Sequence, residues 1–173
     1  MKGAKSIALA GVTSALSVII LALGAYIEVI DLSCLFIASL LIMLPLTKDS
    51  FKTAILCYLA VSILSLIFTV STGRFSITIL YVAFFGLYPI ALRFEEKKNV
   101  NKYLAYPIKA LWFVATCFLM YFVFKVFVLT NEMYEKYIVA IIIVGGLFLF
   151  VVFDYMMKRF QKLTNQIVKR LNF

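Results

Sequence analysis

Six long runs of apolar residues alternate with short polar connections along this chain. Each run is long enough, or nearly so, to cross the roughly 30 Å hydrocarbon layer of a bilayer as a helix. The runs lack the apolar-polar alternation of barrel strands, and lipid offers no partner to an open strand. The second run is short, so we expect it to be partly sheltered or to thin the bilayer locally. The pattern predicts membrane-spanning helices at about 6–26, 32–47, 53–71, 75–92, 104–129 and 137–157.

The composition indicates that lipid is the solvent of this fold. Hydrophobic residues make up 65% of the 173-residue chain, and the mean hydropathy is +1.06. Soluble domains use roughly 45–50% apolar residues, and a chain this small could not bury the excess in a water-soluble core. The sequence shows no linker, low-complexity stretch or convincing internal repeat. We therefore expect an all-α integral membrane protein, with residues 1–173 forming a single domain in which six transmembrane helices make one bundle.

Basic residues concentrate on every second connection, beginning with the N-terminus. By the positive-inside rule this side is cytoplasmic, so both termini are expected there, in a multi-pass protein of a bacterial-type cell (plasma) membrane. The formal charge of +9 then reflects orientation and not nucleic-acid binding. Of the 17 basic residues, only Arg74, Lys125 and Lys136 fall on the other side. The cytoplasmic set comprises Lys2, Lys5, Lys48, Lys52, Arg93, Lys97, Lys98, Lys102, Lys109, Lys158, Arg159, Lys162, Lys169 and Arg170.

Charged residues also occur inside the last two runs. Lys109 and Lys125 flank an uncharged stretch of the fifth run, and we expect both to snorkel to opposite interfaces. In the sixth run, Asp154 is expected to pair with Lys158 one helical turn later.

The chain changes character after Met157. Apolar residues recur at helical spacing among basic ones, which predicts an amphipathic C-terminal helix over 158–173 that lies along an anionic leaflet. A helix that docks on a partner protein is the alternative. The apolar positions are Phe160, Leu163, Ile167 and Leu171.

The sequence gives little support to catalysis. It contains no His, no paired carboxylates and no glycine-rich phosphate loop. Cys34, Cys57 and Cys117 lie inside the apolar runs without metal-ligand spacing. We therefore predict that the protein is not an enzyme and has no catalytic residue, bound metal or cofactor.

Several polar residues at the expected outer face are not explained by topology. They would converge on a polar ligand at the outer end of the bundle, because charged groups near lipid persist where they have a partner or a function. Ordinary solvated loop charges and helix caps are the alternative; Asp31 can cap the second helix, and 71–73 can end the third. The candidate substrate-binding residues are Tyr26, Glu28, Asp31, Arg74, Tyr121, Lys125 and Asn131.

Small residues repeat along the first run. Ala8, Gly11 and Ala15 lie on one helical stripe, where small side chains let another helix approach the backbone closely. The neighbour could be a helix of the same chain or a separate membrane subunit.

The number of spans and this first helix, with small residues in 4–15, resemble the substrate-binding S component of energy-coupling factor (ECF) vitamin transporters. The resemblance implies capture of a vitamin or similar small-molecule micronutrient in the outer half of the bundle. It also implies that the protein topples in the membrane as it docks on a transmembrane coupling subunit driven by two cytoplasmic ATPases. Ala8, Gly11 and Ala15 would meet the coupling subunit. Substrate residues differ among S components, so none is carried over.

Two other classes fit the same size and topology. One is a non-transport membrane scaffold, such as an MreD-like component of cell-wall morphogenesis. The other is a small self-sufficient permease, although six short spans leave little room for alternating access.

Overall fold

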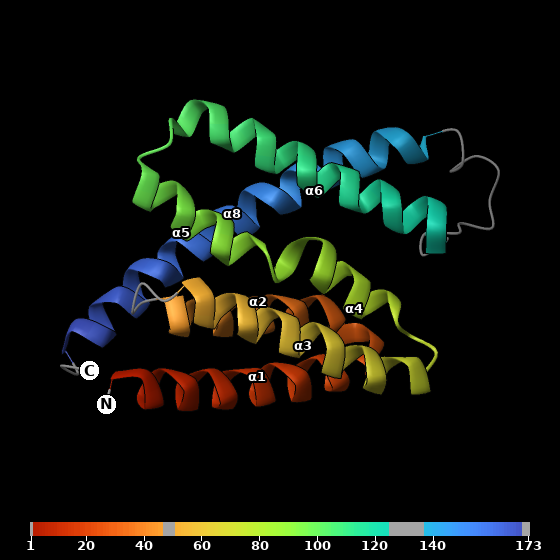
Figure 1. The fold of residues 1–173 in the computed structure, drawn as a ribbon. Helices are drawn as coiled ribbons and strands as arrows, with labels where there is room; N and C mark the ends of the chain where they lie inside the picture. Colours follow the sequence, from red (N-terminus) through yellow and green to blue (C-terminus); the bar gives the residue numbers. More distant parts are fainter. Residues whose placement is uncertain (1, 47–50, 125–136, 171–173) are drawn as a thin grey trace. The chain divides into compact units, whose positions relative to one another are not determined.

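The computed structural model describes residues 2–46, 51–124 and 137–170, and over these ranges it is helical without strands. Figure 1 shows the arrangement. The helices are α1 (Lys2–Tyr26), α2 (Asp31–Leu46), α3 (Phe51–Ser71), α4 (Ser76–Leu80), α5 (Tyr88–Lys98), α6 (Lys102–Phe124) and α8 (Ile138–Arg170), with a 3₁₀ turn η1 (Glu28–Ile30) and a π-helix η2 (Tyr81–Phe85).

Among the described residues, five helical segments are long and apolar enough to cross a membrane. They cover Ile7–Tyr26, Phe51–Ser71, Ser76–Lys98, Tyr103–Phe122 and Ile138–Gln166. The helix α2 is also apolar, but its 16 residues extend only about 24 Å at 1.5 Å per residue. The predicted all-α architecture is therefore confirmed over the described residues, and the five long apolar segments are consistent with a multi-pass membrane protein. Six complete crossings and cytoplasmic termini stay predictions.

The chain divides into two compact units. The larger unit contains Met1–Lys98 together with Met157–Phe173, and the smaller unit contains Asn99–Met156. The single six-helix bundle expected from the sequence stays a prediction.

In the larger unit, α1 packs along α2 and α3 (Figure 1). The buried face of α1 carries small polar residues at helical spacing, including Ser14 and Ser17, followed by Leu21 and Ala25. The approach is close at Gly24, where an added Cβ would lie 2.8 Å from Cys34 Cβ on α2. Small residues on this face thus set how closely α1 lies against its neighbour.

A break in the fourth apolar run follows from Pro89. Proline has no N–H, so the carbonyl of Phe85 cannot receive its usual helical bond from residue 89. The hydroxyl of Ser39 on α2 donates to that carbonyl instead, at 2.6 Å. One turn earlier the helix is widened, because Gly86 N–H bonds to Tyr81 O at 2.7 Å. The helix α2 therefore supplies from outside the bond that proline removes.

The widened turn frees a second carbonyl. In an α-helix Gly86 N–H would bond to Val82 O, but in η2 that oxygen accepts the Tyr58 hydroxyl of α3 at 3.1 Å. Gly86 is what permits this contact, since an added Cβ would lie 2.7 Å from the Tyr58 ring. The ring of Tyr58 also stacks on Tyr81, with centroids 6.3 Å apart.

The C-terminal helix corrects the predicted amphipathic tail. The helix α8 runs unbroken from Ile138 to Arg170 over 33 residues, about 50 Å, so no separate helix begins after Met157. Its last part packs on the larger unit through Phe160, whose ring lies 6.1 Å from that of Phe36. Gln161 is 6% exposed, whereas Phe160 and Leu163 are 38% and 45% exposed. The buried face of this part thus includes an amide beside apolar Met157, because the amide of Gln161 donates to Glu96.

In the smaller unit, α6 packs against the first part of α8. The ring of Phe150 lies 5.4 Å from Tyr106 and 6.0 Å from Phe113. Beside these rings, Lys109 Nζ lies 3.7 Å from Asp154 Oδ1, and both residues are 4% exposed. The expectation that Lys109 snorkels to an interface is therefore wrong, because a buried carboxylate provides its counter-charge.

Candidate functional site

The end of α3 explains where Arg74 lies. Gly73 adopts a left-handed conformation with φ +70°, its N–H bonds to Val70 O, and Arg74 N–H bonds to Thr69 O. This pair of bonds is a Schellman motif, and the sequence correctly predicted that 71–73 ends the helix. The motif turns the chain sharply and places Arg74 beside the start of α2.

Two predicted substrate residues come together at this turn. Arg74 Nη2 lies 3.7 Å from Asp31 Oδ2, with about a third of each side chain exposed. Arg74 Nη1 also donates to Ala25 O at the end of α1, at 3.4 Å. Asp31 Oδ1 accepts from the N–H of the next residue, Leu32, at 2.6 Å. A capping side chain accepts from an N–H two or three residues further on, so the capping role of Asp31 stays a prediction. A partly exposed ion pair contributes modestly to stability. Breaking it so that Arg74 or Asp31 binds an ionised ligand would therefore cost little free energy.

The other predicted substrate residues are not gathered with this pair. Tyr26 is 71% exposed. Glu28 belongs to η1, and its side chain is not among those that the structure describes. Tyr121 is half-buried on α6, in the smaller unit. Lys125 and Asn131 lie outside the described residues, so convergence of the seven residues stays a prediction.

The predicted docking stripe on α1 is exposed. Ala8, Gly11 and Ala15 all face away from the helices of the larger unit, and an added Cβ on Gly11 would meet no atom within 4 Å. Whether these three residues meet a helix of the same chain or a separate subunit stays open, because their exposure is established only within the larger unit. The adjacent stripe, with Ser14 and Ser17, makes the internal contacts instead.

A buried polar contact between α1 and α3 was missed by sequence reasoning. Ser14 Oγ donates to Cys57 Sγ at 2.9 Å, and Thr13 Oγ1 lies 3.3 Å from the same sulfur. The spacing of Thr13, Ser14 and Ser17 on one face of α1 was the available signal. Within the described ranges, no three His, Cys, Asp or Glu residues are grouped as a metal site would require.

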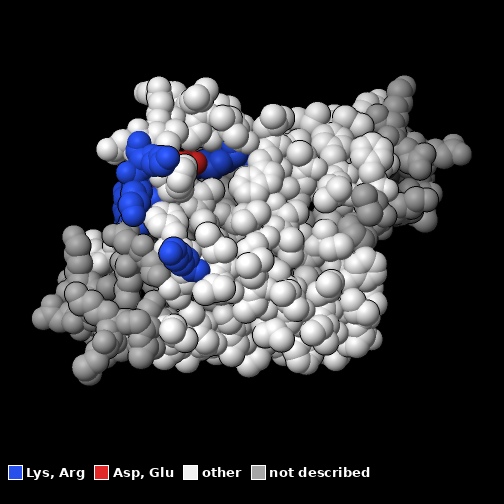
Figure 2. Space-filling view, in the orientation of Figure 1, with Lys and Arg blue, Asp and Glu red and all other residues white. Residues whose placement is uncertain are grey.

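Basic side chains gather at the opposite end of the larger unit from Asp31 and Arg74. Figure 2 shows Lys and Arg atoms clustered near the C-terminal end of α5, beside a face that is otherwise mostly uncharged. Lys97 Nζ lies 5.1 Å from the centre of the Phe51 ring, and Lys98 Nζ lies 4.9 Å from that of Phe94. These contacts hold the cations close to the apolar surface.

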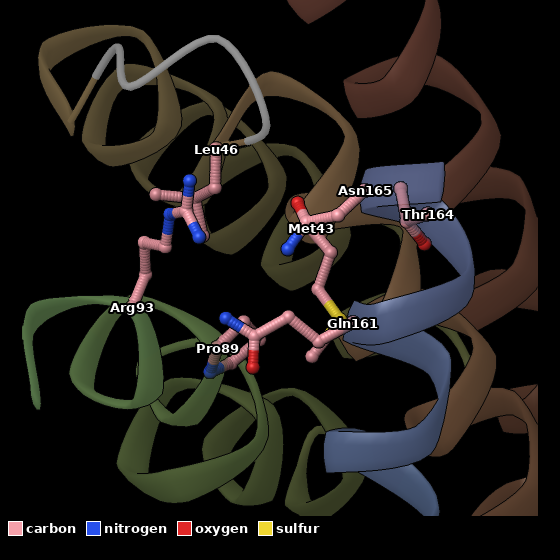
Figure 3. Close-up of a pocket in the computed structure, with 7 residues that line it drawn as sticks. All are labelled: Met43, Leu46, Pro89, Arg93, Gln161, Thr164 and Asn165. Atoms are coloured by element: carbon pink, nitrogen blue, oxygen red, sulfur yellow. The ribbon is translucent and has the colours of Figure 1, made fainter. Parts of the chain in front are cut away.

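A shallow hollow opens at this basic end of the larger unit (Figure 3). Its volume is about 10 Å³, room for about one water molecule. It could not hold a vitamin. No sequence pattern marked it, because its walls come from three helices far apart in the chain. The lining residues are Met43, Leu46, Pro89, Arg93, Gln161, Thr164 and Asn165.

No family model, curated protein or solved structure matches the chain. The function is therefore argued from three features of the described residues: the exposed stripe on α1, the Asp31–Arg74 pair and the basic end. None of them brings together a nucleophile and a base, as covalent catalysis requires.

Proposed function

We propose that this protein is the substrate-capture subunit of an ECF-type, ATP-driven importer. It binds a vitamin or similar micronutrient at its outer end and docks through α1 on a transmembrane coupling subunit, which two cytoplasmic ATPases drive. The proposal includes six membrane crossings with both termini in the cytoplasm. The observation that carries it is the exposed small-residue stripe of Ala8, Gly11 and Ala15.

The two stripes of α1 support a docking role. One stripe is buried and fixes the helix in its own unit, with Gly24 at a close contact. The other presents Ala8, Gly11 and Ala15 outward, between exposed Val12 and Leu16. Lipid tails solvate large aliphatic side chains as readily as small ones, so lipid alone favours no such stripe. A second helix does benefit, because small residues allow close backbone contact and van der Waals packing.

The far end of the same helix supports a role in ligand capture. Arg74 contacts the carbonyl of Ala25, near the last residue of α1, and pairs with half-exposed Asp31. A ligand that carries both an anionic and a cationic group could bind here, its anion pairing with Arg74 and its cation with Asp31. Because α1 is one continuous helix of 25 residues, it joins the proposed capture end rigidly to the docking stripe.

The docking part is tested with a matched pair of glycine substitutions. Gly11→Leu should abolish assembly with a co-expressed coupling module, because the new side chain fills the space that a partner backbone needs. Gly145→Leu is the control: Gly145 lies on α8 and is equally open, with no atom within 4 Å of an added Cβ. Pull-down of the complex measures both. Equal loss in the two variants, or assembly that survives Gly11→Leu, contradicts the proposal.

The capture part is tested by ligand-induced thermal stabilisation. A panel of vitamins and precursors is expected to contain at least one compound that raises the melting temperature of the purified protein. Arg74→Ala should weaken that shift, and so should Lys125→Ala. Gly11→Leu should leave it intact, since position 11 is far along α1 from Arg74. If no compound shifts melting and native mass spectrometry finds no bound small molecule, substrate capture is refuted.

A second candidate is a non-transport membrane scaffold of the MreD-like type. It is favoured by the pairing of Asp31 with Arg74, which lets the two charges satisfy one another without a ligand. Both candidates predict loss of a membrane partner in Gly11→Leu. The ligand panel distinguishes them, since only the importer subunit gains stability from a micronutrient. The recovered partner also distinguishes them, since the scaffold would co-purify with cell-shape proteins.

A further inference from the structure

The hollow at the basic end is lined by apolar side chains of one helix and by polar side chains of two others. Met43 and Leu46 of α2 form an apolar side, and Arg93 of α5 brings a guanidinium to it. Figure 3 shows the amides of Gln161 and Asn165 reaching into the space from α8. The opening is therefore surrounded by hydrogen-bond donors at its rim and by hydrocarbon at its base.

The donors are held in place by one carboxylate. Glu96 Oε2 accepts a bond from Arg93 Nη1 at 2.9 Å and another from Gln161 Nε2 at 2.9 Å. The Arg93 side chain is 20% exposed and that of Glu96 is 50% exposed. The guanidinium and the amide are thus fixed from the solvent side. Their positions do not have to be established when a ligand arrives, which lowers the entropic cost of binding.

The surroundings favour an anion. On α5, Arg93, Lys97 and Lys98 stand against Glu95 and Glu96, a formal sum of +1. The adjoining part of α8 adds three further basic residues and no acidic one: Lys158, Arg159 and Lys162. Charges of one sign around a site with low-dielectric walls raise the local concentration of the opposite ion.

The size and the neighbouring surface indicate which anion. A volume of about 10 Å³ admits one oxygen atom of a phosphate but not a whole metabolite. One helical turn before Thr164, α8 presents Phe160 beside the hollow, and its side chain is 38% exposed. An occupant with a phosphate at one end and hydrocarbon at the other would satisfy both the basic rim and this apolar surface.

We infer that the hollow binds the phosphate of an anionic phospholipid. One phosphate oxygen enters between Arg93 and the amides of Gln161 and Asn165, and an acyl chain covers Phe160. The site joins α5 to the last part of α8 through a lipid as well as through Glu96. It lies at the other end of α1 from Arg74 and does not depend on what the protein transports.

Native mass spectrometry of the full chain in detergent tests this site with phosphatidylglycerol as the probe. Arg93→Gln should weaken binding of the first lipid about tenfold, because a charge-assisted hydrogen bond is lost. Arg159→Gln removes the same charge from an exposed arginine of α8 that does not line the hollow, and should change binding by no more than about twofold. Zwitterionic phosphatidylcholine should bind the unaltered protein more weakly.

Three results would overturn the inference. Equal loss in Arg93→Gln and Arg159→Gln would mean that only the diffuse charge of this end attracts lipid. Equal binding of phosphatidylcholine would remove the role of net charge. Displacement of the lipid by millimolar inorganic phosphate would identify a site for the free ion. If Arg93→Gln does not fold, Asn165→Ala decides, because it leaves the Arg93–Glu96 bond intact: about threefold weaker lipid binding supports the site, and unchanged binding refutes it.

Discussion

Replacing Lys109 by Met should destabilise the protein severely, because it removes a buried cation that balances the buried carboxylate of Asp154. The two groups are 3.7 Å apart, and both residues are 4% exposed. At an effective dielectric constant of about 20, Coulomb attraction at that distance is about 4.5 kcal/mol. Breaking a buried pair by removing one partner typically costs about 3–5 kcal/mol, so we expect a loss of that size in the free energy of unfolding.

The double variant separates this cause from a simple packing defect. Lys109→Met combined with Asp154→Leu removes both charges and keeps the volume approximately constant, so it should recover most of the stability lost in either single variant. Lys158→Met is the second control, because Lys158 is the exposed partner that sequence spacing suggested for Asp154. It should change the free energy of unfolding by no more than about 0.5 kcal/mol.

The assay is reversible unfolding in mixed micelles, titrated with a denaturing detergent and followed by helical circular dichroism. The reasoning is refuted if the two single losses add in the double variant, since additive losses mean that the residues act independently. It is also refuted if Lys158→Met costs as much as Lys109→Met, because Asp154 would then rely on the neighbouring turn of its own helix.

Four further substitutions test the packing of the larger unit by thermal melting. Gly24→Ala should cost about 1–3 kcal/mol because its Cβ would lie 2.8 Å from Cys34 Cβ, and Gly11→Ala, which meets nothing within 4 Å, should be neutral or slightly stabilising. Ser39→Ala should cost about 1–3 kcal/mol, because it removes the buried hydrogen bond from the Ser39 hydroxyl to the carbonyl of Phe85. Tyr81→Phe should cost almost nothing, because its buried hydroxyl finds no hydrogen-bond partner among the described residues.

Each of these expectations has a clear contrary result. Equal effects of alanine at positions 24 and 11 would mean that α1 does not approach α2 closely at Gly24. An unaffected Ser39→Ala variant would mean that the Phe85 carbonyl has another donor. A marked loss in Tyr81→Phe would show that the hydroxyl is satisfied, for example by a buried water.

The local signals in the sequence located most helices well. Run length and hydropathy marked α1, α2 and α3 to within a few residues, and the glycine at position 73 marked the end of α3. Such signals are reliable because they depend on neighbours in the chain: the backbone must bond internally in lipid, and a left-handed residue favours glycine. The break around Pro89 was not placed, because the proline alone does not say whether another helix will replace the lost bond.

The candidate sites were predicted less completely. Small residues on α1 marked two stripes, but only the fold showed that Ala8, Gly11 and Ala15 face outward while Ser14 and Ser17 face inward. Asp31 and Arg74 were both singled out, yet their pairing joins two turns more than 40 residues apart. The hollow around Arg93 had no sequence signal, because its walls come from α2, α5 and α8.

The sequence by itself thus indicated that lipid surrounds the fold, that the chain is helical, and roughly where the helices begin and end. These properties depend on the hydrophobicity of the chain and on residues one or two helical turns apart. Tertiary structure alone decided which partner each buried charge has. Asp154 illustrates the difference: spacing pointed to Lys158 on the same helix, and only the fold showed that Lys109 of another helix lies 3.7 Å from its carboxylate. A buried charge is stabilised by the counter-ion that is desolvated with it, and which groups are desolvated together depends on how the helices pack.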